Sequence, residues 1–149
     1  MSFKTALQDI KQQTRSNSKD DPFVVLQELV KDINETFPGK LDAQIGFGED
    51  PKTGQILEYN FYLIAAIGNG YVYQLFTLKT SQDSVVPFGY PLTISTSFTP
   101  EYQLKLDEAK NEKELRIKIG EILQRPFVKD LIQNLIIQID LHKRAKSPK

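Results

Sequence analysis

The residues that most often perform catalysis are scarce in this chain. His142 is the only histidine, and there is no cysteine. A nucleophilic serine or threonine needs a base held within hydrogen-bond reach. His142 stands beside the basic C-terminal segment, where a solvated histidine is the favoured interpretation. The chain also lacks a Gly-x-Ser-x-Gly motif. We therefore predict that the protein is not an enzyme.

The acidic residues do not form a recognisable metal or cofactor site. With one histidine and no cysteine, a metal ion would need oxygen ligands. Asp42, Glu49 and Asp50 fall near one predicted loop, but no EF-hand pattern surrounds them. Glu58 is the one acid in the middle of a predicted strand, and a solvent-facing position is favoured over a buried catalytic acid. We predict no metal and no cofactor. The alternative, an enzyme built on Glu58 or Asp42, would require a concave cluster of acids.

Two close glycine pairs, Gly46 with Gly48 and Gly68 with Gly70, invite comparison with phosphate-binding loops. Neither pair is followed by Gly-Lys-Ser/Thr, and neither leads directly into a helix. Gly68 and Gly70 are therefore predicted to form the turn of a hairpin. Gly46 and Gly48 are predicted to serve a turn, with a β-bulge as the alternative.

Tyrosine and isoleucine side chains in residues 55–79 are the candidate binding residues. Tyrosine is enriched at protein interfaces because it combines a large apolar area with a polar hydroxyl. One register of a hairpin places four candidates on a single sheet face: Tyr62, Ile64, Tyr71 and Tyr73. The alternative is that the chain's own helices cover that face. Nucleic acid is not expected, because residues 41–100 carry two basic and five acidic groups and so lack a basic surface.

The same residues, 55–79, are predicted to be the structural centre of the protein. They read as two strands joined at residues 68–70, and both strands are apolar on both faces, which is typical of central strands. In the first strand the alternation puts one set of side chains on a common face: Leu57, Tyr59, Phe61, Leu63 and Ala65. In the second strand it predicts that Val72, Gln74, Phe76 and Leu78 face one way and Tyr71, Tyr73, Leu75 and Thr77 the other.

Helices and further strands are predicted on either side of this hairpin. Apolar residues recur with helical spacing in four segments, residues 3–10, 23–37, 115–123 and 127–139. Ser2, Asp21 and Asn111 are the predicted N-caps. Alternation predicts a strand over residues 41–47 and another within 85–98, the latter at an edge or a bulge because of Pro87 and Pro91. Residues 102–106 allow a fifth strand. The predicted class is α+β, an antiparallel four-stranded meander flanked by two N-terminal and two C-terminal helices in the order α-α-β-β-β-β-α-α.

Composition and charge complete the prediction. The 149 residues are 40% hydrophobic and 26% charged, which favours a single domain over residues 1–142 followed by a basic disordered tail over 143–149. The N-terminal segment lacks the apolar core of a signal peptide, and no apolar run reaches the roughly 20 residues that span a bilayer. We therefore expect a cytoplasmic protein without membrane contact. The sparse charge of residues 41–100 means that helices cover both sheet faces or that one face meets a partner.

These observations predict a non-enzymatic protein–protein interaction module, chaperone-like or adaptor-like. We expect it to form a homodimer through the sheet or the C-terminal helix. The alternative is a small-molecule-binding domain with an aromatic pocket between the sheet and the helices.

Overall fold

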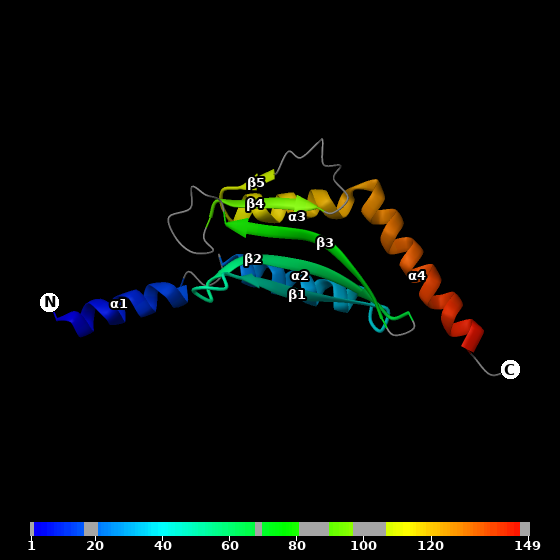
Figure 1. Ribbon diagram of the computed structural model, residues 1–149, viewed down its shortest axis with the longest axis horizontal. Coiled ribbons are helices and arrows are strands. Elements are labelled where there is room, and N and C mark those ends of the chain that lie inside the picture. The colour runs from blue at the N-terminus through cyan, green and yellow to red at the C-terminus, as the bar shows by residue number, and fades with distance from the viewer. Residues whose placement is uncertain (1, 17–20, 68–69, 81–89, 97–106, 147–149) are drawn as a thin grey trace.

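The structure, a computed structural model, describes residues 2–16, 21–67, 70–80, 90–96 and 107–146 (Figure 1). Within these ranges four helices and five strands follow the predicted order, and the α+β class is confirmed. The elements are α1 (Phe3–Ser16), α2 (Pro22–Thr36), β1 (Leu41–Glu49), β2 (Ile56–Ala65), β3 (Tyr71–Thr80), β4 (Leu92–Thr96), β5 (Asp107–Ala109), α3 (Glu112–Gln124) and α4 (Pro126–Lys146). The fifth strand lies at 107–109, whereas residues 102–106, where one was predicted, lie outside the described residues.

The sheet is an antiparallel meander with the spatial order β1-β2-β3-β4-β5. Strands β1 and β5 are its edges. For the strand predicted within residues 85–98, proline indicated an edge or a bulge. The edge position is wrong, because β4 pairs with both β3 and β5, and the described pairing of β4 has no register shift. Pro91 directly precedes β4, where its missing N–H removes no hydrogen bond from the ladder. Pro87 lies outside the described residues.

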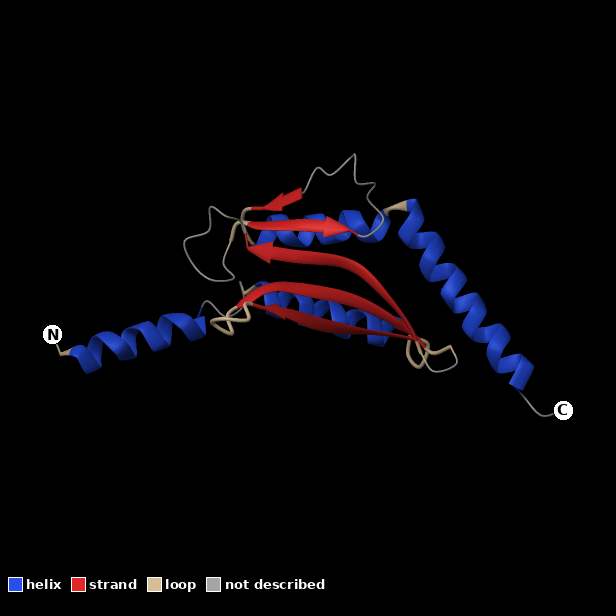
Figure 2. Ribbon diagram, in the orientation of Figure 1, coloured by secondary structure: helices blue, strands red, loops and turns tan. Residues whose placement is uncertain are grey.

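Three helices cover one face of the sheet. Helices α2 and α3 lie side by side behind the strands, and α4 slants away from the end of α3 past the hairpin end of β2 and β3 (Figure 2). Lys40 Nζ lies 3.2 Å from Asp140 Oδ1, which links α4 to the residue before β1. The core is formed by the buried side chains of these layers, the largest fully buried ones being Phe61, Phe76, Leu26, Leu63, Leu75, Leu78, Leu92, Leu115, Ile122, Ile139 and Val128. None of the described helices covers the opposite face, which we call the open face.

The predicted helix caps are present. The Ser2 hydroxyl accepts a hydrogen bond from the Thr5 amide at 3.2 Å. The Asp21 and Asn111 side chains accept hydrogen bonds from backbone amides at the starts of α2 and α3, each at 2.9 Å. At the other end of the chain, the prediction of a disordered tail over 143–149 fails for its first part. Helix α4 continues to Lys146, and residues 147–149 lie outside the described residues.

The face assignment predicted for β3 is wrong. The register shifts between Phe61 and Tyr62 of β2, so that β3 contains one residue, Leu75, without a partner of its own. This β-bulge turns Leu75 and Phe76 toward the helices, and both are fully buried. The helix-facing side chains of β3 are therefore Tyr71, Tyr73, Leu75, Phe76 and Leu78, and those on the open face are Val72, Gln74, Thr77 and Lys79.

Helix α1 stands apart from the other layers. It projects away from the end of the sheet where β1 ends (Figure 1). The helix predicted from the spacing of its apolar residues is present, but these side chains remain exposed. Phe3, Leu7 and Ile10 keep 90%, 64% and 58% of their surface exposed. None of the described helices combines the length and the apolar character that a membrane crossing requires.

Candidate functional site

The four predicted binding residues do not share one face. Cross-strand partners in an antiparallel pair lie on the same side of the sheet. Tyr62 and Ile64 lie opposite Gln74 and Val72, on the open face. Tyr73 and Tyr71 lie opposite Leu63 and Ala65, on the helix-covered face. The predicted single patch of Tyr62, Ile64, Tyr71 and Tyr73 is therefore split by the register.

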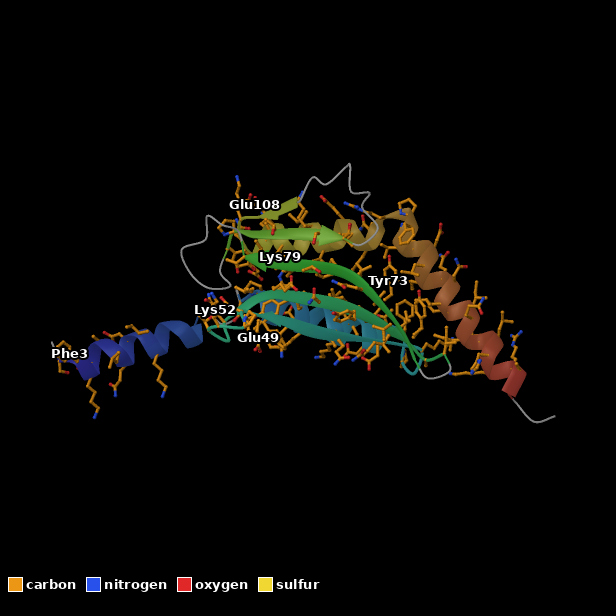
Figure 3. The ribbon with its side chains drawn as sticks, viewed as in Figure 1. Phe3, Glu49, Lys52, Tyr73, Lys79 and Glu108 are labelled. Carbon is orange, nitrogen blue, oxygen red and sulfur yellow. The ribbon has the colours of Figure 1, made fainter. Side chains whose placement is uncertain are left out.

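Tyr73 belongs to the packing between the sheet and α4. Its side chain is half-buried against the core, and its ring centroid lies 6.4 Å from that of Phe127 in the first turn of α4. Figure 3 shows Tyr73 on the part of β3 that lies beside α4. Tyr71, two residues earlier, stays half-exposed. Their helix-facing position explains why two tyrosines occur so close together without forming an exposed platform.

The middle of the open face is polar, whereas Tyr62, Ile64 and Val72 make the part nearer the end of β2 and the start of β3 apolar. The Thr77 hydroxyl donates to Asn60 Oδ1 at 2.8 Å and accepts from Gln74 Nε2 at 2.7 Å. Gln74 Nε2 also donates to Asn60 Oδ1 at 3.0 Å. Glu58 and Lys79 form an ion pair at 3.6 Å in the neighbouring row. Uncharged polar side chains thus explain how the middle of this sheet face can have few charges and yet have no described helix packed on it.

Gly46 and Gly48 lie opposite open-face residues of β2, and neither lies in a turn. Both are within β1, so the predicted turn is wrong. The register shift beside Gly48 leaves Leu57 of β2 without a partner, so the bulge lies in the strand opposite the glycines and not at the glycines themselves. A Cβ on Gly46 would lie 2.9 Å from a ring carbon of Tyr62, so the glycine leaves room for the tyrosine ring. A Cβ on Gly48 would overlap the side chain of Glu58 in the same way.

An apolar groove lies between α2 and β1, along the edge of the sheet. It encloses about 640 Å³ and is open to solvent. Helix α2 supplies one wall and β1 the other, with apolar side chains at the base and polar ones at the rim. The lining residues are Phe23, Gln27, Val30, Lys31, Asn34, Glu35, Ala43, Gln44, Ile45 and Phe47. We call this feature the α2–β1 groove.

An aromatic cluster lies at one end of the α2–β1 groove, where Phe23 and Phe47 line the groove and Tyr59 packs against both. The centroid of the Phe23 ring lies 5.7 Å from those of Phe47 and Tyr59, and Phe47 meets Tyr59 edge-on at 5.4 Å. Tyr59 is buried beneath, and its burial, followed by the negative charge of Asp21, raises the pKa of its hydroxyl above the ordinary value. Phe47 keeps 49% of its surface exposed. The cluster therefore presents an aromatic surface that its own chain covers only in part.

The sequence contains a signal for this groove, although the prediction did not use it. In the alternation over residues 41–47, Phe47 falls on the same side as Leu41, Ala43 and Ile45. In the helical spacing over residues 23–37, Phe23 falls on the apolar face. Both assignments hold. The predicted meander also makes the first strand an edge of the sheet. What the pattern could not show is that α2 packs against this edge in a way that leaves the Phe47 side chain half exposed.

The charged cluster between α2 and α3 is a structural contact. The Arg116 guanidinium donates to Glu28 Oε2 and to Glu112 Oε1, each at 2.7 Å. The hydrogen bond from Arg116 lowers the pKa of Glu28, and the two carboxylates raise the pKa of Arg116. Every charge in the cluster has an opposite partner, so the cluster joins two helices and supplies no reactive group.

The described residues hold no group of three or more histidine, cysteine, aspartate or glutamate side chains that could bind a metal ion. Asp42 and Asp50 instead accept hydrogen bonds from nearby backbone amides, at 2.7 and 2.8 Å. His142 lies half-buried in the last turns of α4, whereas the sequence predicted a solvated histidine.

No protein-family model, curated protein or solved structure matches this chain. The apolar base of the α2–β1 groove is suited to holding an apolar segment.

Proposed function

We propose that the protein is a non-enzymatic, adaptor-like interaction module that binds an amphipathic segment of a protein partner in the α2–β1 groove. The observation that carries this proposal is the aromatic and aliphatic base of the groove, formed by Phe23, Val30, Ile45 and half-exposed Phe47. Partly covered apolar surface of this kind, surrounded by polar side chains, is typical of protein-binding sites. A cytoplasmic location is part of the same proposal.

The dimensions of the groove favour a helical or extended peptide segment. Its α2 wall includes Phe23, Gln27, Val30 and Asn34, which follow one stripe along the helix. Eleven residues separate the first from the last, and at 1.5 Å per residue the wall is about 16 Å long. That length corresponds to about three helical turns of a bound segment. An amphipathic helix laid in an apolar groove is a recurrent mode of protein recognition.

The open sheet face and α4 are weaker candidates for the main binding surface. The open face has its central polar groups in hydrogen bonds with one another, and an apolar partner would have to desolvate them. Helix α4 exposes Ile137 and Leu141 at about half their surface, but neither residue lines the α2–β1 groove.

Selection from a displayed peptide library tests the proposed function. Peptides would be selected on the full chain and counter-selected on Phe47→Glu, which puts a charge into the aromatic end of the groove. The expected result is a set of amphipathic peptides that bind the native chain at least about tenfold more tightly than the variant, a difference of about 1.4 kcal/mol. Peptides that bind both proteins equally would contradict a binding site in the groove.

A small apolar ligand is the alternative occupant of the α2–β1 groove. Its volume of about 640 Å³ lies within the range of about 300–1,000 Å³ that is usual for ligand sites. A thermal-shift screen with aromatic and aliphatic compounds would favour this alternative if hits stabilise the native chain, Phe47→Glu abolishes the shift and no peptide binds.

A further inference from the structure

We propose that the segment bound in the α2–β1 groove is extended and pairs, as an added strand, with the free edge of β1. This inference rests on the proposed protein-binding role of the groove and names the conformation and the side-chain pattern of its occupant. It is carried by the backbone of β1, which directs unpaired hydrogen-bonding groups into the groove.

Strand β1 is paired on one side only. Figure 1 shows it at the margin of the sheet, next to β2, and none of the described strands pairs with its other side. The unpaired side of an edge strand presents a row of N–H and C=O groups with which another chain can pair. The free edge of β1 therefore has the groups that an added strand requires.

The ladder with β2 determines which residues of β1 face the free edge. The Lys40 carbonyl accepts a hydrogen bond from the Ala66 amide at 3.1 Å, and the register continues with Leu41 opposite Ala65. Residues of an antiparallel pair alternate between bonding to the partner strand and pointing away from it. The even-numbered residues from 42 to 48 therefore bond to β2, and the odd-numbered residues from 41 to 47 direct their backbone groups to the free edge.

Two of these edge-facing amides have partners within the chain. The Leu41 amide donates to the carbonyl of the residue that ends α2, at 3.1 Å, and the Ala43 amide donates to Asp42 Oδ1 at 2.7 Å. Neither acceptor belongs to β2, as the alternation requires. The described residues supply no acceptor for the amides of Ile45 and Phe47. The part of the edge that can accept a strand is thus centred on these two residues.

The α2–β1 groove runs along this part of the edge. Its β1 wall consists of Ala43, Gln44, Ile45 and Phe47. Gln44 lies opposite Tyr62 and so faces the open side of the sheet, whereas the other three face the helices. Because successive side chains of a strand point to opposite faces, a groove lined by both kinds lies beside the backbone of that strand. A segment in the groove is therefore next to the unpaired amides.

The dimensions of the groove predict the pattern of the added strand. The α2 wall, about 16 Å long, corresponds to about five residues of a strand at roughly 3.3 Å each. Alternate side chains would face the apolar base formed by Phe23, Val30 and Ile45, and the intervening ones would lie beside Gln44 and in solvent. The expected partner is an extended segment of about five residues in which apolar and polar side chains alternate.

A helical segment would use the groove less completely. A helix bonds its own N–H groups to its own carbonyls, so it would leave the amides of Ile45 and Phe47 unpaired beneath it. Unpaired amides that a ligand removes from water cost free energy. The free edge thus favours the extended form of the segment.

A segment of a partner also suits the edge better than a second copy of the chain. Two copies joined by their β1 strands in one continuous sheet, about a two-fold axis, would carry both α2 helices on the same side of that sheet. Because α2 already lines the groove, the groove would then be closed by a second helix rather than filled by a strand.

Amide hydrogen exchange, followed by NMR on the full chain, tests whether the edge is free. In the native chain alone, the amides of Ile45 and Phe47 should exchange at least about tenfold faster than those of Gln44 and Gly46, which bond to β2 and are the internal controls. A peptide selected on the full chain should slow the exchange of Ile45 and Phe47 by at least about tenfold. Amides of Ile45 and Phe47 that are already as slow as the controls in the free chain would overturn the inference.

N-methylation of the selected peptides, one position at a time, separates a strand from a helix. Methylation removes a backbone N–H, and in an added strand only alternate N–H groups face β1. Affinity should therefore fall at least about tenfold at alternate positions, while the intervening positions, which are the matched controls, should change it by less than about twofold. Losses at every interior position would indicate a helix, whose hydrogen bonds use each N–H, and would overturn the strand pairing.

The remaining outcomes distinguish this inference from the proposed function. Peptides that Phe47→Glu weakens, but that leave the exchange of Ile45 and Phe47 fast, would overturn the strand pairing and leave the proposed function standing. A library that yields no groove-dependent peptide would remove both. Protection of Ile45 and Phe47 that rises with the concentration of the chain alone would assign the edge to a second copy and overturn the partner segment.

Discussion

Replacement of Thr77 by valine tests the hydrogen-bond network of the open face. Thr77 is only 8% exposed, and its hydroxyl is bonded to both Asn60 and Gln74. Valine has nearly the same shape but no hydroxyl. The substitution therefore removes two hydrogen bonds while it leaves the packing of β3 in place.

The expected loss of stability is about 1–2 kcal/mol. A hydrogen bond within a protein contributes about 0.5–1.5 kcal/mol net, and two are removed. The loss should stay below the largest value that two such hydrogen bonds could give, because Gln74 still donates to Asn60 Oδ1 at 3.0 Å and is exposed enough to bind water. At about 2–4 °C per kcal/mol for a chain of this size, the Tm should fall by about 2–8 °C.

Chemical denaturation of the native chain, Thr77→Val, Gln74→Ala and the double variant provides the measurement. The losses should be less than additive, because both single changes break the same hydrogen bond. Thr93→Val is the matched control, since the Thr93 hydroxyl on the same face makes only a 3.4 Å contact with the Lys79 carbonyl. The reasoning fails if Thr77→Val is as stable as the native chain, or if it costs no more than Thr93→Val.

Two pH dependences follow from the ionisable groups. Burial raises the pKa of Tyr59 above its ordinary value of 10.0, so this tyrosine ionises first in the unfolded chain, and the free energy of unfolding should fall as the pH rises above about 10. In alkaline denaturation, the free energy of unfolding of Tyr59→Phe should fall less steeply with pH than that of the native chain. Equal slopes for the two proteins would refute this. The hydrogen bond from Arg116 lowers the pKa of Glu28, so its contribution is present above the unfolded pKa and lost as the pH falls through the folded one. Glu28→Gln should thus have a lower Tm than the native chain at neutral pH, and the two melting curves should converge in acid; a constant gap would contradict the assignment.

The sequence allowed prediction of the order of the elements because their signals are local. Helical spacing and the caps Ser2, Asp21 and Asn111 are read within a few residues of the helices they begin. The meander followed from short connections between successive strands. The buried side of β2, with Tyr59, Phe61 and Leu63, also followed from simple alternation.

The candidate site could not be predicted because it depends on relations between distant segments. The pairing of Tyr62 with Gln74 and of Leu63 with Tyr73 is a property of two strands. It divides the four predicted binding residues between two faces. The α2–β1 groove depends in addition on how α2 packs beside the edge strand β1, which no pattern within residues 41–49 records. The continuation of α4 to Lys146 was missed for a simpler reason, since a polar, basic end resembles an unstructured tail.

The bulge at Leu75 has a consequence for which side chains of β3 can touch. In a regular strand, neighbours on one face are separated by an even number of positions. Gln74 and Thr77 are separated by three, yet their side chains are bonded at 2.7 Å. The unpaired residue between them changes the parity of the strand, so that odd-numbered side chains face the helices before it and even-numbered ones after it. One inserted residue thus gives this strand an i, i+3 contact of the kind ordinarily reserved for helices.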